Sequence, residues 1–111
     1  VDFMPHVAPH FRGLSITCNM HLKQASSADQ VLSAYRDFYC GEAMIEVTSA
    51  APWLSEVAGT PLARLGGFTL SADGRRLVAV SVLDNLLKGA ASQALQNINL
   101  GLGLPETLGV L

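Results

Sequence analysis

The sequence predicts an α+β domain in which helices cover the faces of a sheet. Three stretches carry this prediction: an alternating apolar and polar run at 14–23, an amphipathic run with helical spacing at 27–39, and an apolar run at 77–83 behind an Asp-Gly turn. Strand, helix, three further strands and a last helix follow one another, an order that favours an α+β sandwich. The 111 residues are long enough for one domain with its own core.

Composition narrows the functional classes. Half of the residues are hydrophobic and only 14% are charged, which indicates a compact domain or one that hides a large interface. The net charge of −2 and the seven scattered basic residues argue against a nucleic-acid-binding surface. No apolar run reaches the roughly 18 to 20 residues of a membrane span. Because the chain opens on Val1 without an initiator Met, we expect a piece of a longer protein.

The first strand and helix follow from simple patterns. Residues 14–23 alternate strictly, so Cys18 is expected to point into the core as a structural thiol rather than a nucleophile. With Cys40 it makes too few cysteines for a disulfide framework, and a reducing compartment is the default. Ser27 and Gln30 have the spacing of a capping box, and the helix that they begin is expected to end at Cys40-Gly41.

The middle of the chain reads as three strands. Met44–Thr48 is a short strand candidate, and Leu62–Leu70 is a longer one whose Gly66-Gly67 pair predicts a bulge or a close approach to another backbone. Ser71–Arg76 contains the Asp-Gly pair of a hairpin turn. The strand that follows, Leu77–Leu83, is apolar at both parities, so both of its faces should be covered.

The last helix has an unusual composition. Asp84 or Asn85 can cap its start, and helix-favouring residues run on to Gly101. Lys88 is the only charged residue after Asp84 in this stretch, and small residues and uncharged amides surround it. Such a helix is expected to be covered on more than one side. Its N-terminus, with free N–H groups beside Lys88, also suits an anionic or polar ligand.

The opening segment holds the other candidate side chains. Arg12 offers a planar fork for a carboxylate or phosphate, with an ordinary salt bridge as the alternative. His6 is a candidate for orienting a ligand or moving a proton, with a structural histidine as the alternative. His6 and His10 are four residues apart, but Pro9 argues against a helix between them, so no metal site is predicted.

Spaced motifs make the sequence more specific. They are Pro5-His6-x-x-Pro9-x-x-Arg12-Gly13, Gly59-Thr60, Gly66-Gly67-Phe68, and a final stretch that runs from Asp84-Asn85-Leu86-Leu87-Lys88-Gly89-Ala90-Ala91 to Gln96-Asn97-x-Asn99. Together they resemble the N-acetyl-γ-glutamyl-phosphate reductase family over the whole chain. Aspartate-semialdehyde dehydrogenases share the Asp-Asn-Leu-x-Lys-Gly-Ala-Ala segment, so that piece alone indicates only the superfamily. The Pro-His…Arg-Gly opening and the Gln-Asn-x-Asn ending favour the acetylglutamyl enzyme.

The resemblance implies an NADP-dependent oxidoreductase of arginine biosynthesis that reduces an acyl phosphate to an aldehyde. The family places its dinucleotide-binding domain, nucleophilic cysteine and acid/base histidine upstream of the Pro-His motif, and none of them is in this sequence. Residues 1–111 are therefore expected to be a C-terminal catalytic and dimerisation domain, inactive alone. The implied sheet is mixed and mostly antiparallel with helices on one face, and the last helix is expected to pack on the missing domain and to expose its small-residue and amide face here.

The resemblance also implies residue roles. Arg12 is expected to contact the anionic substrate and His6 to orient it, whereas Asn85, Lys88 and Gly89 are expected to contact NADP. No catalytic residue and no metal ligand is expected in this chain.

Further expectations concern partners and location. The partners are an acyl-phosphate small molecule, a second copy of the chain and acetylglutamate kinase, with no nucleic acid and no membrane. The location is the cytoplasm, or the mitochondrion for a fungal-type bifunctional precursor. The alternatives are an aspartate-semialdehyde dehydrogenase-like enzyme and a non-catalytic, stand-alone dimerisation module.

Overall fold

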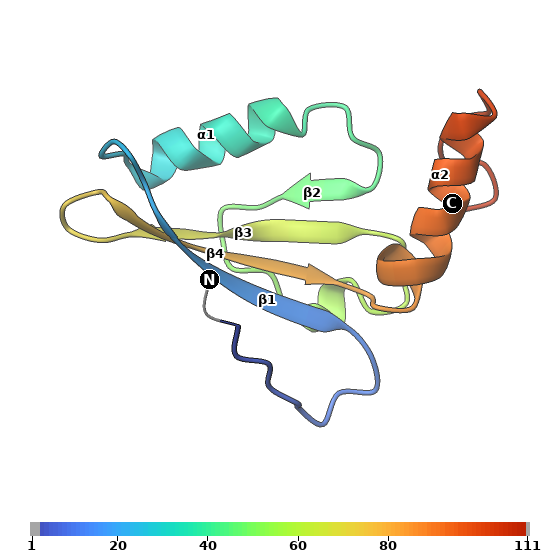
Figure 1. Cartoon of the computed structure of the whole chain (residues 1–111), viewed down its shortest axis with the longest axis horizontal. Helices are drawn as coiled ribbons and strands as arrows, with labels where there is room; N and C mark the ends of the chain where they lie inside the picture. The colour runs from blue at the N-terminus through green and yellow to red at the C-terminus, as the bar shows by residue number, and fades with distance from the viewer. Residues whose placement is uncertain (1–2, 111) are drawn as a thin grey trace.

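The computed structural model describes residues 3–110 and confirms the α+β class (Figure 1). A four-stranded mixed sheet has the order β1-β4-β3-β2. The strands β1 and β3 pair with β4 in antiparallel fashion, whereas β2 runs parallel to β3. The bounds are β1 (Leu14–His21), α1 (Ala28–Phe38), β2 (Ile45–Val47), β3 (Ala63–Leu70), β4 (Arg76–Leu83) and α2 (Ser92–Gly101).

The predicted local signals hold. Ser27 caps α1, its side chain accepts from Gln30, and the Gln30 side chain accepts in return from the Ser27 backbone, which is a full capping box. The Asp-Gly turn joins β3 to β4, and Gly74 takes a φ of 67° there, a value that glycine adopts without strain. The register of β3 against β4 shifts between Gly66 and Thr69, which confirms the predicted bulge.

The helix α1 covers only part of one sheet face. Val31 is buried beneath it, and the ring of Tyr35 lies 4.7 Å from that of Phe68 on β3, centroid to centroid. These side chains form the core with two residues of β4, Leu77 and Ala79. The contacts of α1 run to β2 and β3. Among the described residues, no helix therefore covers the far edge of this face, which β1 forms.

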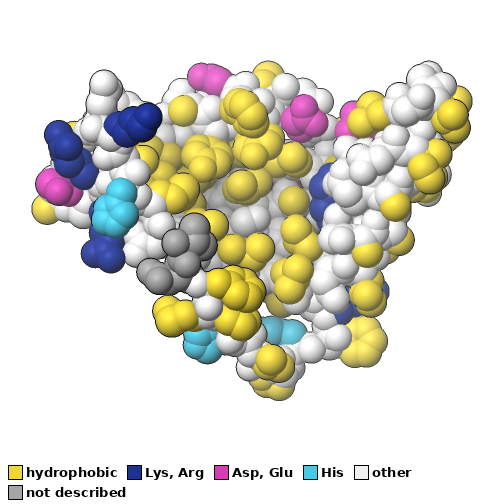
Figure 2. Space-filling model, viewed as in Figure 1, with side chains coloured by type: hydrophobic (Ala, Val, Ile, Leu, Met, Phe, Trp, Pro, Cys, Tyr) yellow, Lys and Arg dark blue, Asp and Glu magenta, His cyan; other side chains and the backbone are white. Residues whose placement is uncertain are grey.

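The prediction of a buried Cys18 is wrong, because this side chain is exposed. The alternation does predict the correct face for this side chain. Cys18 pairs with Ala79, so both belong to the face that bears the core. However, β1 is an edge strand beyond the reach of α1, and its Leu14 and Ile16 are each 47% exposed. Figure 2 shows the result as an apolar expanse over the sheet between the two helices.

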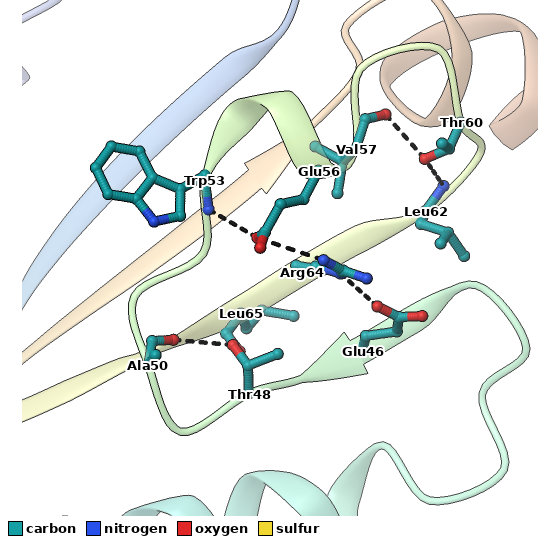
Figure 3. Close-up of polar contacts among 10 residues, drawn as sticks. All are labelled: Glu46, Thr48, Ala50, Trp53, Glu56, Val57, Thr60, Leu62, Arg64 and Leu65. Carbon is teal, nitrogen blue, oxygen red and sulfur yellow. Dashed lines mark hydrogen bonds and ion pairs between the residues drawn. The ribbon is translucent and has the colours of Figure 1, made fainter.

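The other sheet face is covered by the connection between β2 and β3, which includes one short helical turn at Leu54–Glu56. Figure 3 shows how side chains fasten it: Arg64 of β3 pairs with both Glu46 and Glu56, and Glu56 accepts in turn from the Trp53 backbone N–H at 2.9 Å. Val57 in this connection and Val82 of β4 are buried, with exposed fractions of 0% and 1%. The strand β4 thus has cover on this face as well.

The last helix differs from a regular helix at its start. It opens with a π-helical turn, Leu87–Ala91, in which Gly89 donates to the carbonyl of Asp84 and Ala91 to that of Leu86. It ends at Gly101, as predicted. The helix α2 stands at one end of the sheet rather than on a face (Figure 1). No helix within residues 3–110 is both long enough and apolar enough to cross a bilayer.

The last helix was expected to expose both its small residues and its amides, and the amide part of this expectation is wrong for two residues. Asn99 is buried because its side chain donates to the carbonyls of Glu106 and Leu108, at 3.0 and 2.9 Å. Gln96 is buried too and donates to the Glu106 carboxylate. The chain's own tail therefore satisfies these two amides. Between residues 89 and 100, the exposed positions are small residues, one amide and two large apolar residues: Gly89, Ala90, Ala91, Ala94, Asn97, Ile98 and Leu100.

Gly66 provides a test of the packing between β3 and the connection. A Cβ at Gly66 would lie 2.6 Å from the carbonyl oxygen of Thr48 and closer still to that of Ala50, and both are backbone atoms. Gly66→Ala should therefore lower the free energy of unfolding by roughly 1 to 3 kcal/mol, the usual cost of overpacking. Urea denaturation monitored by Trp53 fluorescence measures it.

Gly101→Ala is the matched control, because a Cβ there meets nothing within 4 Å. It should leave the stability unchanged or raise it by up to about 1 kcal/mol, the helix preference of Ala over Gly. Equal stabilities of the Gly66 variant and the native chain would contradict the described approach of the two backbones.

Candidate functional site

An open cavity of about 630 Å³ lies between the opening loop and the connection that precedes β3. Phe11 and Trp53 give it apolar walls and are themselves largely exposed, at 99% and 74%. Arg12 and Gly59 supply its polar part. The full lining is His10, Phe11, Arg12, Trp53, Leu54, Ser55, Ala58 and Gly59.

Arg12 forms an ion pair with a residue 72 positions away. Its Nε atom is 2.7 Å from Oδ2 of Asp84, whose side chain is fully buried, while the Arg12 side chain is 28% exposed. The salt-bridge alternative is therefore realised. Only the Nε edge is used, however, and no side chain or backbone acceptor within residues 3–110 bonds the two Nη groups. Those groups remain available as donors at the cavity.

Asp84 uses both carboxylate oxygens. Oδ1 accepts from the backbone N–H groups of Leu86 and Leu87 at 2.9 and 3.1 Å, so Asp84 binds the turn that leads into the last helix, whereas Leu86 stands at the N-cap position. Oδ2 accepts from the backbone N–H of Gly59 at 2.7 Å and faces Arg12. Burial alone would raise the pKa of Asp84, but these three N–H groups and the Arg12 charge outweigh it and lower the pKa below its usual value.

A second bond joins the same two segments. The backbone N–H of Gly13 donates to Oδ1 of Asn85 at 2.7 Å. Because a backbone N–H can only donate, this bond identifies which amide atom of Asn85 is the oxygen. The Nδ2 atom of Asn85 remains available as a hydrogen-bond donor. The pairs Arg12-Gly13 and Asp84-Asn85 thus bind one another, Arg12 to Asp84 and Gly13 to Asn85, so the segments of two predicted site residues lie together.

The other predicted site residues lie apart from this pair. Lys88 donates to Oε1 of Gln96 at 2.7 Å, and burial lowers its pKa against the attraction of Glu106 and Glu42. Gly89 is exposed in the π-helical turn. His6 is exposed, and its ring nitrogen Nδ1 lies 3.0 Å from the carbonyl oxygen of Met4. The structure therefore links the segments of Arg12 and Asn85 through Asp84 and Gly13, and it leaves His6 and Lys88 with local contacts.

Sequence reasoning missed two contributors. Asp84 was identified only as a helix cap, although it also binds Arg12 and Gly59. Gly59 was part of a motif without a role; its φ of 81° and the Nη2 atom of Arg12, 3.1 Å from where its Cβ would be, explain why glycine stands there. The available signal was an acidic residue directly behind an apolar strand, which needs a partner once buried.

The chemistry that this arrangement supports is binding. A guanidinium with free Nη groups beside apolar walls suits an anion that carries a carbon chain. Neither cysteine lines the cavity, and within residues 3–110 no three His, Cys, Asp or Glu side chains are grouped to hold a metal ion. The lining of this cavity therefore provides no cysteine nucleophile for thioester chemistry.

The lowered pKa of Asp84 makes stability depend on pH. A carboxyl whose folded-state pKa is below its unfolded value, about 3.9, stabilises the fold above that pH and loses this contribution as the pH falls through the folded pKa. Asp84→Asn should thus reduce the free energy of unfolding most above about pH 5, and the difference should shrink below about pH 4. Urea denaturation from pH 7 to pH 3 measures it.

Asp37→Asn is the control, since Asp37 is an exposed carboxylate on α1 remote from this bonding. It should have little effect at pH 7. A loss on Asp84→Asn that is the same at every pH would show that the charge of Asp84 does not contribute.

Known proteins with similar sequences belong to the family that the motifs of this chain resemble. Residues 1–85 match the family model described as semialdehyde dehydrogenase, dimerisation domain. Proteins named N-acetyl-gamma-glutamyl-phosphate reductase are similar to almost the whole chain: that of Stenotrophomonas maltophilia (strain R551-3) is 52% identical over 110 residues, and that of Xanthomonas campestris pv. campestris (strain 8004) is 49% identical. The matched part is 99% of this chain and 35% of each relative, so the chain spans about a third of their length.

A solved structure shares the fold. The aspartate semialdehyde dehydrogenase II of Vibrio cholerae superposes with a TM-score of 0.70 over 86% of this chain and 28% of that one, at 21% sequence identity. This similarity supports the fold alone. Because the family model covers most of the chain, and the curated relatives at about 50% identity carry the reductase name, the chain belongs to the semialdehyde dehydrogenase family through its dimerisation domain.

Proposed function

We propose that this chain is the substrate-side and dimerisation part of an N-acetyl-γ-glutamyl-phosphate reductase that uses NADP. The overall reaction converts the acyl phosphate, the reduced cofactor and a proton into the aldehyde, the oxidised cofactor and inorganic phosphate. The observation that carries the proposal is the mutual bonding of Arg12-Gly13 and Asp84-Asn85, two motifs that the resemblance associates with substrate and cofactor. The similarity to reductases over 99% of the chain supports it.

Arg12 binds the anionic part of the substrate in this proposal. Its Nε edge is occupied by Asp84, and its Nη groups line a cavity with Phe11 and Trp53. A carboxylate or phosphate would accept two parallel bonds from such a planar fork. The apolar walls suit the carbon chain of an acylated amino acid. His6 as an orienting residue stays a prediction.

Asn85 and Gly89 contact the cofactor in this proposal. The Asn85 amide has its oxygen bound to Gly13, so its Nδ2 can donate to an oxygen of the nicotinamide side, and Gly89 next to it is exposed. The bound cofactor supplies a hydride. Lys88 was predicted here too, but its bond to Gln96 favours a structural role. The acetylglutamate kinase partner and the cytoplasmic location stay predictions.

The uncovered part of the sheet is proposed as the contact with a second copy of the chain. Leu14 and Ile16 are each 47% exposed and belong to the core side of the sheet. An exposed apolar patch of this kind marks an interaction site. A second copy is favoured because the matching family model is described as a dimerisation domain.

Arg12→Lys in the full-length protein tests the substrate role. A Lys Nζ can pair with Asp84 but then offers no planar fork to the substrate. We expect kcat/KM for phosphate-dependent oxidation of N-acetylglutamate semialdehyde with NADP to fall by an amount that corresponds to roughly 1.5 to 3 kcal/mol, the contribution of a charge-assisted hydrogen bond. The 111-residue chain alone should show no turnover.

Arg76→Lys is the matched control, because Arg76 also uses its Nε, in a bond of 3.2 Å to exposed Asn19 at the other end of β4. It should retain the native kcat/KM. Turnover of aspartate semialdehyde in preference to the acetylated aldehyde would select the other branch of the superfamily. A full-length protein without activity on either aldehyde would favour the non-catalytic module.

The proposed dimer surface predicts a change of oligomeric state. Ile16→Lys places a charge on the exposed apolar side of β1 and should shift the sedimentation coefficient of the full-length protein toward that of a monomer. Thr17→Lys changes the next residue, whose side chain points to the opposite sheet face, and should leave sedimentation unchanged. Equal sedimentation of the two variants would place the dimer contact elsewhere.

A further inference from the structure

Asp84 uses both carboxylate oxygens in contacts with four donors. Its two oxygens together accept three backbone N–H groups and face one guanidinium, and the side chain has no exposed surface. The bonds to Leu86 and Leu87 begin the last helix, whereas the contacts with Gly59 and Arg12 belong to the cavity. One carboxylate therefore connects the start of the helix to the cavity wall.

The Arg12 guanidinium is constrained on two sides. Asp84 lies 2.7 Å from its Nε, and the Gly59 backbone lies against its Nη2, since a Cβ on Gly59 would be only 3.1 Å away. A long flexible side chain loses conformational entropy when it is held in this way. An unconstrained arginine would lose that entropy only on binding a ligand, which would weaken the binding. The Nη groups are thus oriented before any ligand arrives.

We propose that Asp84 is the positioning residue of the substrate site. Its carboxylate fixes the guanidinium of Arg12, so that the anion binds to donors that are already oriented. This inference rests on the proposed function, because it assumes that Arg12 contacts the acyl-phosphate substrate. It adds a residue that binds neither substrate nor cofactor and acts through Arg12.

Asp84→Asn alters the contact with Arg12 while one carboxylate oxygen is kept as an amide oxygen. The Asn Oδ1 can keep the bonds from Leu86 and Leu87, so the start of the helix is retained. The Asn NH₂ group then faces the Gly59 N–H and the Arg12 Nε, which are donors themselves, and the negative charge is lost. Arg12 loses its constraint without a change in its own chemistry.

A double-mutant cycle in the full-length enzyme tests the proposal. Arg12→Gln and Asp84→Asn should each lower kcat/KM for the acyl phosphate roughly 10- to 150-fold, mainly through KM. In the Arg12→Gln background, Asp84→Asn should lower it by less than about threefold further, because the residue through which Asp84 acts is already gone. Arg76→Gln is the control and should keep the native kcat/KM.

A purely structural Asp84 gives a different pattern. The fold-losses of kcat/KM in the two single variants would then multiply in the double variant, so that their free energies add. This outcome overturns the positioning role. Native kinetics of Arg12→Gln would overturn both the positioning role and the substrate role of Arg12. Thermal denaturation of each variant shows that the enzyme measured is folded.

A second measurement does not depend on turnover. The ¹⁵Nε–H resonance of Arg12, identified by its absence in Arg12→Gln, should exchange with solvent at least tenfold faster in Asp84→Asn than in the native protein. Unchanged exchange overturns the proposal even in an active enzyme. Faster exchange in a protein without reductase activity would leave Asp84 as the constraint on Arg12 and would remove the proposed function instead.

Discussion

The carboxylate of Asp84 is the point at which three segments far apart in the sequence meet: the opening loop, the connection before β3, and the turn that leads into the last helix. A buried charge without partners would cost several kcal/mol, so its location is tolerable only because every oxygen lone pair faces a donor. The arrangement of the cavity follows from this need. Arg12 and Gly59 are where they are because Asp84 must be satisfied.

The two sheet faces obtain their cover from different sources. The connection with Trp53 and Glu56 crosses one face and is fastened to β3 through Arg64 (Figure 3), so that this face is closed by the chain itself. On the other face α1 lies over β2 and β3, and within residues 3–110 no helix lies over β1. The edge strand β1 therefore exposes apolar Leu14 and Ile16 on its core side, which agrees with a family model described as a dimerisation domain.

Most of the fold could be predicted from the sequence because its signals are local. The capping box of Ser27, the hairpin turn with Gly74 and the bulge at Gly66 each depend on residues a few positions apart. Cys18 shows where such signals end. Period-2 alternation tells which side chains share a face, but whether the face is covered depends on where α1 happens to lie. The prediction that Gln96 and Asn99 are exposed is wrong for a similar reason, since their hydrogen-bond partner, Glu106, lies in the tail.

The candidate site was predictable as a set of residues and not as an arrangement. Arg12 and Asn85 were selected by resemblance, but their connection passes through bonds that span 72 residues and that no periodicity encodes. The connection also removes an apparent choice between a salt-bridged and a ligand-binding Arg12. An arginine has two edges, and pairing one edge with a buried carboxylate orients the other. In the proposed function, the salt bridge therefore lowers the rotamer-entropy cost of binding the substrate and does not compete with that role.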